Sequence, residues 1–159
     1  MSSRPFNVLL VASDRAILRH VSRLLTVFSY RIRTATSYAQ AAHLMEADKP
    51  DILLLDGADR QQALELCREA AALPRGQYVY KLAFAEDMQP GDVVQFLEAG
   101  VDDVLASALE HGELLARLRA AARVLEFERR VAGHGARSKL LLLDRETFFS
   151  CLEAELAVE

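Results

Sequence analysis

The sequence has little cysteine and no long apolar run, and both absences limit what the chain can be. Only two cysteines, Cys67 and Cys151, occur in 159 residues. They form neither a disulfide framework nor a metal-ligand cluster. No stretch approaches the roughly 20 apolar residues that a membrane-spanning helix requires. The first residues lack the pattern of a secretory signal, so we expect a cytoplasmic protein that does not enter the membrane.

An excess of positive charge is also absent. The formal net charge is -4 and the pI is about 5.6. We therefore expect no direct contact with nucleic acid. The histidines have no metal-ligand spacing, which favours structural or surface roles and predicts no metal site among them. They are His20, His43, His111 and His134.

Apolar segments of strand length alternate with segments of helical periodicity along most of the chain. This order is typical of repeated βαβ units around a parallel sheet. The predicted strands are residues 6–12, 30–35, 52–55, 78–84 and 103–106, and the predicted helices are about 14–27, 38–47, 61–73, 92–99 and 113–131. The second strand is short and polar, which is typical of a sheet edge.

The third strand, Ile52 to Leu55, is apolar at every position and ends in Asp56. In open α/β sheets, functional groups gather beyond the carboxyl ends of the strands. Here the chain resembles the receiver domain of two-component response regulators over residues 6–131, through VLLVASDRAILRHV, PDILLLD and LEAGVDDVLASALEHGELLARLRAAAR. The resemblance implies a flavodoxin-like, doubly wound, five-stranded parallel sheet of order 2-1-3-4-5, with five helices and a C-terminal helical extension.

The resemblance also implies a phospho-acceptor site. Asp56 matches the aspartate that accepts the phosphoryl group in this family. The acidic pair that holds Mg²⁺ there is replaced by Ala12 and Ser13. Asp14, one residue further on, either caps the following helix or partly substitutes as a metal ligand.

Two further positions of the family's site are also changed. The hydroxyl residue at the end of strand four matches Ala83, and the lysine that ends strand five matches Ser107. Together, the changes at the four positions remove the ligands of Mg²⁺, the ammonium group of the lysine and the hydroxyl group, all of which stabilise phosphoryl transfer.

Lysine is unusual in a covered strand, yet Lys81 lies in strand four on the same face as Ala83. One interpretation is that Lys81, or Arg15 from the first loop, pairs with Asp56, because an unpaired buried carboxylate is costly. The alternative is that Lys81 extends to solvent and Asp56 is hydrated. Phe84 either covers the pocket or serves only in packing.

Residues 1–131 are predicted to form the receiver-like domain. Residues 132–159 are a linker and a C-terminal helical segment after the break at Gly133 to Gly135. The stretch LLLLDRETFFSCLEAEL is similar to the opening segment of GGDEF-type diguanylate cyclase domains, which implies the start of an output domain, although no GGDEF signature is present. Exposed leucines at 140–143 would favour association.

The sequence therefore predicts a pseudo-receiver and not an enzyme. Such a domain acts in signal transduction by binding a protein partner or by dimerisation, through the C-terminal face and the last helix, and needs no cofactor. The alternative is an active phospho-acceptor of a two-component phosphorelay that uses Asp56 with Mg²⁺ and regulates a cyclase-type, c-di-GMP-forming output. A third reading is that the vacated pocket binds a small ligand.

Overall fold

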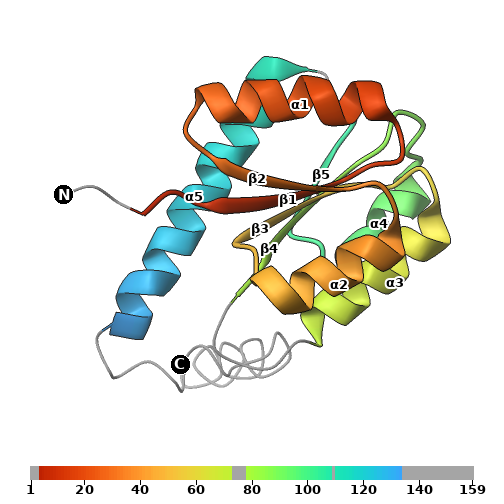
Figure 1. The fold of residues 1–159 in the computed structure, drawn as a ribbon. Helices are drawn as coiled ribbons and strands as arrows, with labels where there is room; N and C mark the ends of the chain where they lie inside the picture. The colour runs from red at the N-terminus through yellow and green to blue at the C-terminus, as the bar shows by residue number, and fades with distance from the viewer. Residues whose placement is uncertain (1–3, 73–77, 109, 134–159) are drawn as a thin grey trace, which may run out of the picture. The chain divides into compact units, whose positions relative to one another are not determined.

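The computed structural model describes residues 4–72, 78–108 and 110–133 (Figure 1). The predicted segment from Ser138 onward, with its GGDEF-like stretch and its leucines, lies outside the described residues, as do Cys151 and His134. The chain divides into two compact units, Met1–Leu125 and Glu126–Glu159. The first unit therefore ends slightly before the boundary at residue 131 that the sequence predicts.

The first unit is built on one five-stranded sheet. Its strands are β1 (Asn7–Val11), β2 (Arg31–Ala35), β3 (Ile52–Asp56), β4 (Tyr80–Phe84) and β5 (Asp103–Leu105). They pair in parallel in the order β2-β1-β3-β4-β5. The structure thus confirms the doubly wound, flavodoxin-like topology.

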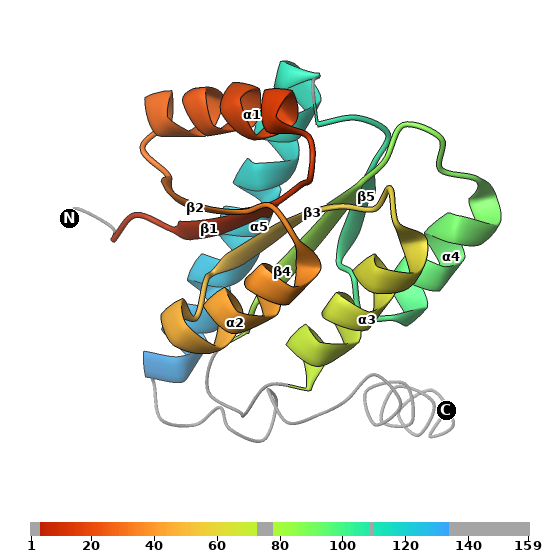
Figure 2. The same cartoon turned by 45° about the vertical axis from the view of Figure 1, so that its right-hand side comes forward.

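Helices cover both faces of this sheet. They are α1 (Arg15–Val27), α2 (Tyr38–Asp48), α3 (Arg60–Ala71), α4 (Pro90–Glu98) and α5 (His111–Gly133). Within the first unit, α1 and α5 lie on one face, and α2, α3 and α4 lie on the other (Figures 1 and 2). Asp14 and Ser37 accept hydrogen bonds from the first turns of α1 and α2, as expected of N-caps.

The apolar run of β3 is explained by its central position. Leu54 packs in the core under α1 and α5, whereas Leu53 and Leu55 pack in the core under α2, α3 and α4. Successive strand side chains point to opposite faces, so a strand covered on both sides needs apolar residues throughout. β2 pairs with β1 alone, and its exposed Arg31 and Arg33 confirm the predicted polar edge.

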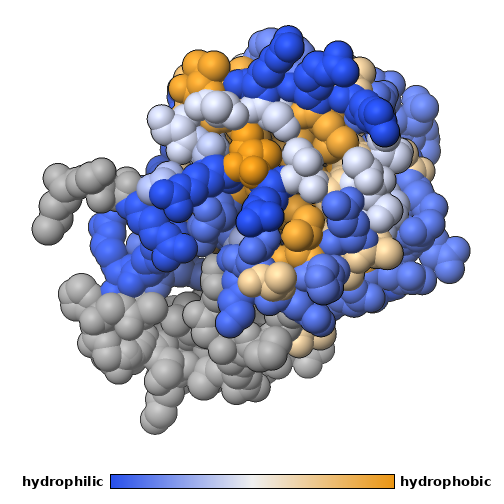
Figure 3. Space-filling model, viewed as in Figure 1, coloured by the Kyte–Doolittle hydropathy of each residue, from blue (hydrophilic) through white to orange (hydrophobic). Residues whose placement is uncertain are grey.

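The surface of the first unit is mostly polar. In the face shown in Figure 3, hydrophilic residues separate several small apolar patches. The most exposed large apolar side chains in this unit are Val27 and Val94, with exposed fractions of 77% and 52%. Within the described ranges, no helix combines the length and the apolar character needed to cross a membrane.

Candidate functional site

Asp56 is the last residue of β3 and lies half-buried at the carboxyl edge of the sheet. Its Oδ1 accepts a hydrogen bond from the Ala58 backbone N–H at 2.9 Å, and its carbonyl oxygen accepts one from the Tyr38 hydroxyl at 2.8 Å. Burial raises the pKa of Asp56, and the nearby Asp14 carboxylate raises it further. Burial also raises the pKa of Tyr38 to about 12, so its hydroxyl stays protonated and donates.

A pocket of about 620 Å³ opens beside Asp56. Its lining comes from the segments that follow β1, β3, β4 and β5, the edge at which open α/β sheets place their functional groups. The charged side chains that line it are Asp14, Asp56, Arg60, Glu86 and Asp87. Four carboxylates therefore share this pocket with a single guanidinium group.

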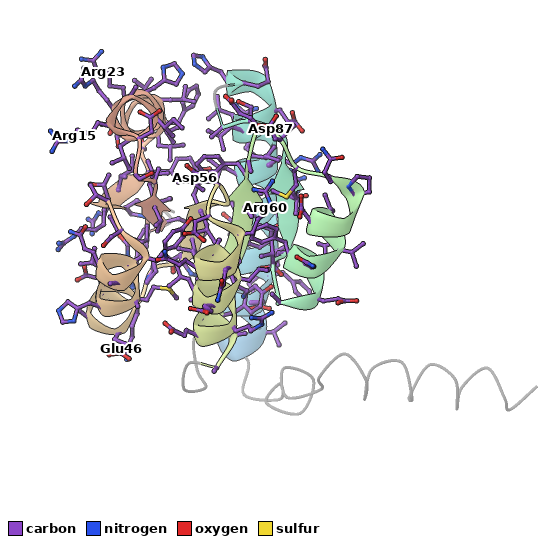
Figure 4. The ribbon with its side chains drawn as sticks, turned by 90° about the vertical axis from the view of Figure 1, so that its right-hand side faces the viewer. Arg15, Arg23, Glu46, Asp56, Arg60 and Asp87 are labelled. Atoms are coloured by element: carbon purple, nitrogen blue, oxygen red, sulfur yellow. The ribbon has the colours of Figure 1, made fainter. Side chains whose placement is uncertain are left out.

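Arg60 supplies that guanidinium from the first residue of α3. It donates to the carbonyl oxygen of Gly57, just after β3, and at 3.1 Å to the carbonyl oxygen of Asp87, after β4. Its Nε lies 3.3 Å from Oδ2 of Asp92 in the first turn of α4. Arg60 therefore ties the β3–α3 loop to the β4–α4 loop and to the start of α4. Figure 4 shows Arg60 close to Asp56 and Asp87.

Asp92 is held in place from two sides. Its Oδ2 accepts a hydrogen bond at 3.0 Å from the backbone N–H of Gln89. This bond is the main cause that lowers the pKa of Asp92, and Arg60 lowers it further. Asp92 therefore presents a charged carboxylate to Arg60.

The residues after β1 provide no metal-binding pair. Ala12 is 2% exposed and packs in the core under α1 and α5, and Ser13 is exposed at the pocket. Asp14 caps α1, with its Oδ1 accepting from Ala16 N–H at 2.8 Å, which supports its reading as a cap. Among the described residues, no group of three or more potential ligands could hold a metal ion. Ala12 and Ser13 therefore supply no carboxylate for the Mg²⁺ ion that the resemblance implies.

The structure corrects the predicted place of Ala83. Its side chain packs in the core under α2, α3 and α4, and it does not line the pocket. Phe84 is the residue in register with Asp56, and it lines the pocket while it packs in the core under α1 and α5. Because neighbouring residues of a strand face opposite sides, a difference of one position decides which side chain reaches the site.

Ser107 lies where the sequence predicts it. It is half-buried after β5 and lines the pocket together with Ala108. Its hydroxyl carries no charge, so this side of the pocket lacks an ammonium group.

Lys81 does not pair with Asp56, so that prediction is wrong. The lysine is 5% exposed, and its Nζ donates to the carbonyl oxygen of Val79 at 2.8 Å and lies 3.8 Å from Oδ2 of Asp102. Its side chain therefore runs back toward the amino end of β4, away from the pocket. The alternative, an extension to solvent, is excluded by the same burial. Arg15 is exposed on α1 and points away from Asp56 (Figure 4).

Sequence reasoning missed Arg60 and Tyr38 as neighbours of Asp56. The available signal for Arg60 was its place directly after Asp59, which accepts a hydrogen bond from Gln62 N–H at 3.2 Å and caps α3. A cap at this position fixes the first helical residue close to the end of β3. Tyr38, at the start of α2, gave no comparable signal.

The buried cysteine has no part in this chemistry. Cys67 lies in the core under α2, α3 and α4, and burial raises the pKa of its thiol to about 12. A thiol that stays protonated at neutral pH is a poor nucleophile, so packing is its role.

Comparisons with known proteins agree with this geometry. No protein-family model matches the chain. It is 32% identical over 120 residues to the response regulator MprA of Mycolicibacterium vanbaalenii, which covers 75% of this chain and 51% of the relative. It is 30% identical over 141 residues to the response regulator MprA of Mycobacterium bovis, which covers 88% of this chain and 60% of the relative. The chain thus spans between half and three fifths of the length of these relatives.

A solved structure shows the same fold. The response regulator receiver domain protein (CheY-like) of Methanospirillum hungatei superposes with a TM-score of 0.71 at 21% sequence identity. The match covers 79% of this chain and 99% of that one. At this level of identity the likeness establishes the fold alone.

The Lys81 contacts can be tested by a double-mutant cycle. We expect Lys81→Met to lower the free energy of unfolding by about 1–3 kcal/mol, because it removes one partner of a buried polar contact. The loss should shrink by about 1 kcal/mol or more in an Asp102→Asn background and stay unchanged in an Asp56→Asn background. Urea denaturation measures all six proteins, namely the wild type, the three single variants and the two double variants. A loss that shrinks with Asp56→Asn instead would restore the pairing with Asp56.

The raised pKa of Asp56 predicts a pH-dependent stability. A carboxyl group whose pKa rises on folding binds its proton more tightly in the folded state, so its ionisation weakens the fold as the pH rises through that pKa. We expect Asp56→Asn to stabilise the protein near neutral pH and to lose this advantage as the pH falls toward about 4. Urea denaturation at both pH values checks this, with exposed Glu46→Gln as the control. No gain at neutral pH would contradict it.

Proposed function

This chain carries a response-regulator receiver domain of two-component signalling, and we propose that it works as a pseudo-receiver. In such a domain, the loops after β3 and β4 are held in one arrangement without a phosphoryl group. The observation that carries the proposal is the set of contacts made by Arg60. It joins the loops after β3 and β4 and the start of α4, beside the carboxylate that would otherwise be modified.

The charge around Asp56 supports the same conclusion. Phosphoryl transfer to a carboxylate needs positive charge to offset that of the acceptor and of the incoming phosphate. The pocket instead brings three further carboxylates, Asp14, Glu86 and Asp87. Among the described residues, Arg60 is the only cationic side chain that lines the pocket, and its guanidinium is already engaged by backbone oxygens and Asp92.

The proposed output is a contact with protein. Apolar side chains are exposed on α4 and α5: Val94 by 52%, Leu97 by 41% and Val124 by 41%. Exposed apolar side chains of this size favour association when they form a continuous surface. We propose that the domain acts through these helices, by self-association or by binding a partner. A diguanylate cyclase output and the absence of direct nucleic-acid contact stay predictions.

The alternative is an active phospho-acceptor. It is favoured by the half-exposed position of Asp56 and by the closeness of Asp14, whose carboxylate acts on the pKa of Asp56. Under this alternative, Asp14 would leave its capping role and take part in holding Mg²⁺.

Beryllofluoride, a mimic of the phosphoryl group, separates the two readings. We expect no saturable, Mg²⁺-dependent shift of the wild-type amide signals near Asp56 in two-dimensional NMR. The double variant Ser13→Asp/Ser107→Lys, which returns a carboxylate and an ammonium group to the pocket, should gain such a shift. Both changed residues lie at the pocket and outside the core.

Two controls complete this experiment. Adding Asp56→Asn to the double variant should abolish the gained shift, and light scattering should give the wild type the same mass with and without a phosphodonor. A saturable wild-type shift that Asp56→Asn removes would establish the active phospho-acceptor in place of the pseudo-receiver.

A further inference from the structure

Two histidines that are far apart in sequence meet on the surface of the first unit. His20 lies in the middle of α1 and is half-buried, and His111 is the exposed first residue of α5. Their ring centroids are 4.5 Å apart, and their Nε2 atoms are 2.5 Å apart. Neither residue lines the Asp56 pocket.

This contact requires at least one neutral imidazole, because one Nε2 must accept where the other donates. The neutral Nε2 atom is also the most common metal ligand in proteins. Two such atoms that lie this close together can ligate the same ion once the rings separate slightly. Zinc binds imidazole nitrogen at about 2.0–2.1 Å in tetrahedral geometry, which places two ligand nitrogens roughly 3.4 Å apart. The rings must therefore separate by about 1 Å, a movement that the exposed ring of His111 allows by side-chain rotation.

The surroundings leave room for the remaining ligands. The two rings border a groove of about 440 Å³, with Leu24 and Val27 as its apolar part. Among the described residues no third histidine, cysteine or carboxylate completes a cluster, so water would fill the other positions.

The charged groups near the pair narrow the choice of ligand. Arg19 and Arg23 of α1 are exposed and line the same groove, whereas Glu110 immediately precedes His111. Glu113, two residues after His111 on α5, forms an ion pair with Arg117, with its Oε1 3.4 Å from Nη2 of the arginine. The two guanidinium groups disfavour a hard cation held by charge alone. The two guanidinium groups weaken the binding of an ion held through nitrogen donors to a smaller extent, because solvent screens the repulsion between exposed charges.

We propose that His20 and His111 bind one divalent transition metal ion of the zinc type and thereby cross-link α1 to the start of α5. The segment that precedes α5 contributes Ser107 and Ala108 to the Asp56 pocket. A metal ion at the histidine pair thus fixes one wall of that pocket, an input to the domain that does not depend on a phosphoryl group.

Calorimetric titration of the untagged full chain with ZnCl₂ at about pH 7.5 tests this proposal, since imidazole is then mostly neutral. We expect one ion per chain. His20→Gln and His111→Gln should each lower the affinity at least tenfold, roughly the scale of losing a group that a metal site depends on. The double variant should lose little more than either single one.

His43→Gln is the matched control, because His43 is exposed on α2. It should bind zinc as the wild type does, and circular dichroism should show that all variants fold. Zinc should also raise the melting temperature of the wild type and of His43→Gln, and not that of the other variants. Absence of zinc binding, or binding that survives both histidine substitutions, would overturn the proposal.

Discussion

The contacts of Arg60 are the interaction on which the arrangement of the site depends. The first residue of α3 reaches two loops and the next helix through Gly57, Asp87 and Asp92. Both loops line the pocket beside Asp56, so a side chain that joins them limits their freedom to rearrange. Ser13 and Ser107 also line this pocket with uncharged hydroxyl groups, and our proposal of a pseudo-receiver rests on both features.

The fold was largely predictable, because it follows from burial. The unbroken apolar run of β3, the polar β2 and the alternation of strand-like with helix-like periodicity indicate a parallel sheet that helices cover on both faces. The strand order followed from the resemblance to receiver domains and not from these patterns. In the structure, Asp14 and Ser37 cap α1 and α2, and each lies one residue before the first residue of its helix. Asp56 was predictable for a similar reason, since it ends the central strand.

The polar contacts of the site were less predictable, because they depend on register and on side-chain direction. Phe84 and not Ala83 is in register with Asp56, so the residue that reaches the site differs by one position from the prediction. Lys81 has a long, flexible side chain that can turn toward either end of its strand, and the carboxylate of Asp102 lies at the amino end. His20 and His111 are 91 residues apart, so only the packing of α1 beside α5 brings them together.

Hydrogen exchange of the Arg60→Gln variant tests the central claim most directly. The account predicts that amides in the loops after β3 and β4 exchange at least about fivefold faster than in the wild type, since the lost hydrogen bonds contribute roughly 1 kcal/mol. Exchange in β1 should not change, and neither should the loops in Arg68→Gln, an exposed residue of α3. Unaltered exchange of both loops in Arg60→Gln would contradict the claim that this arginine holds them.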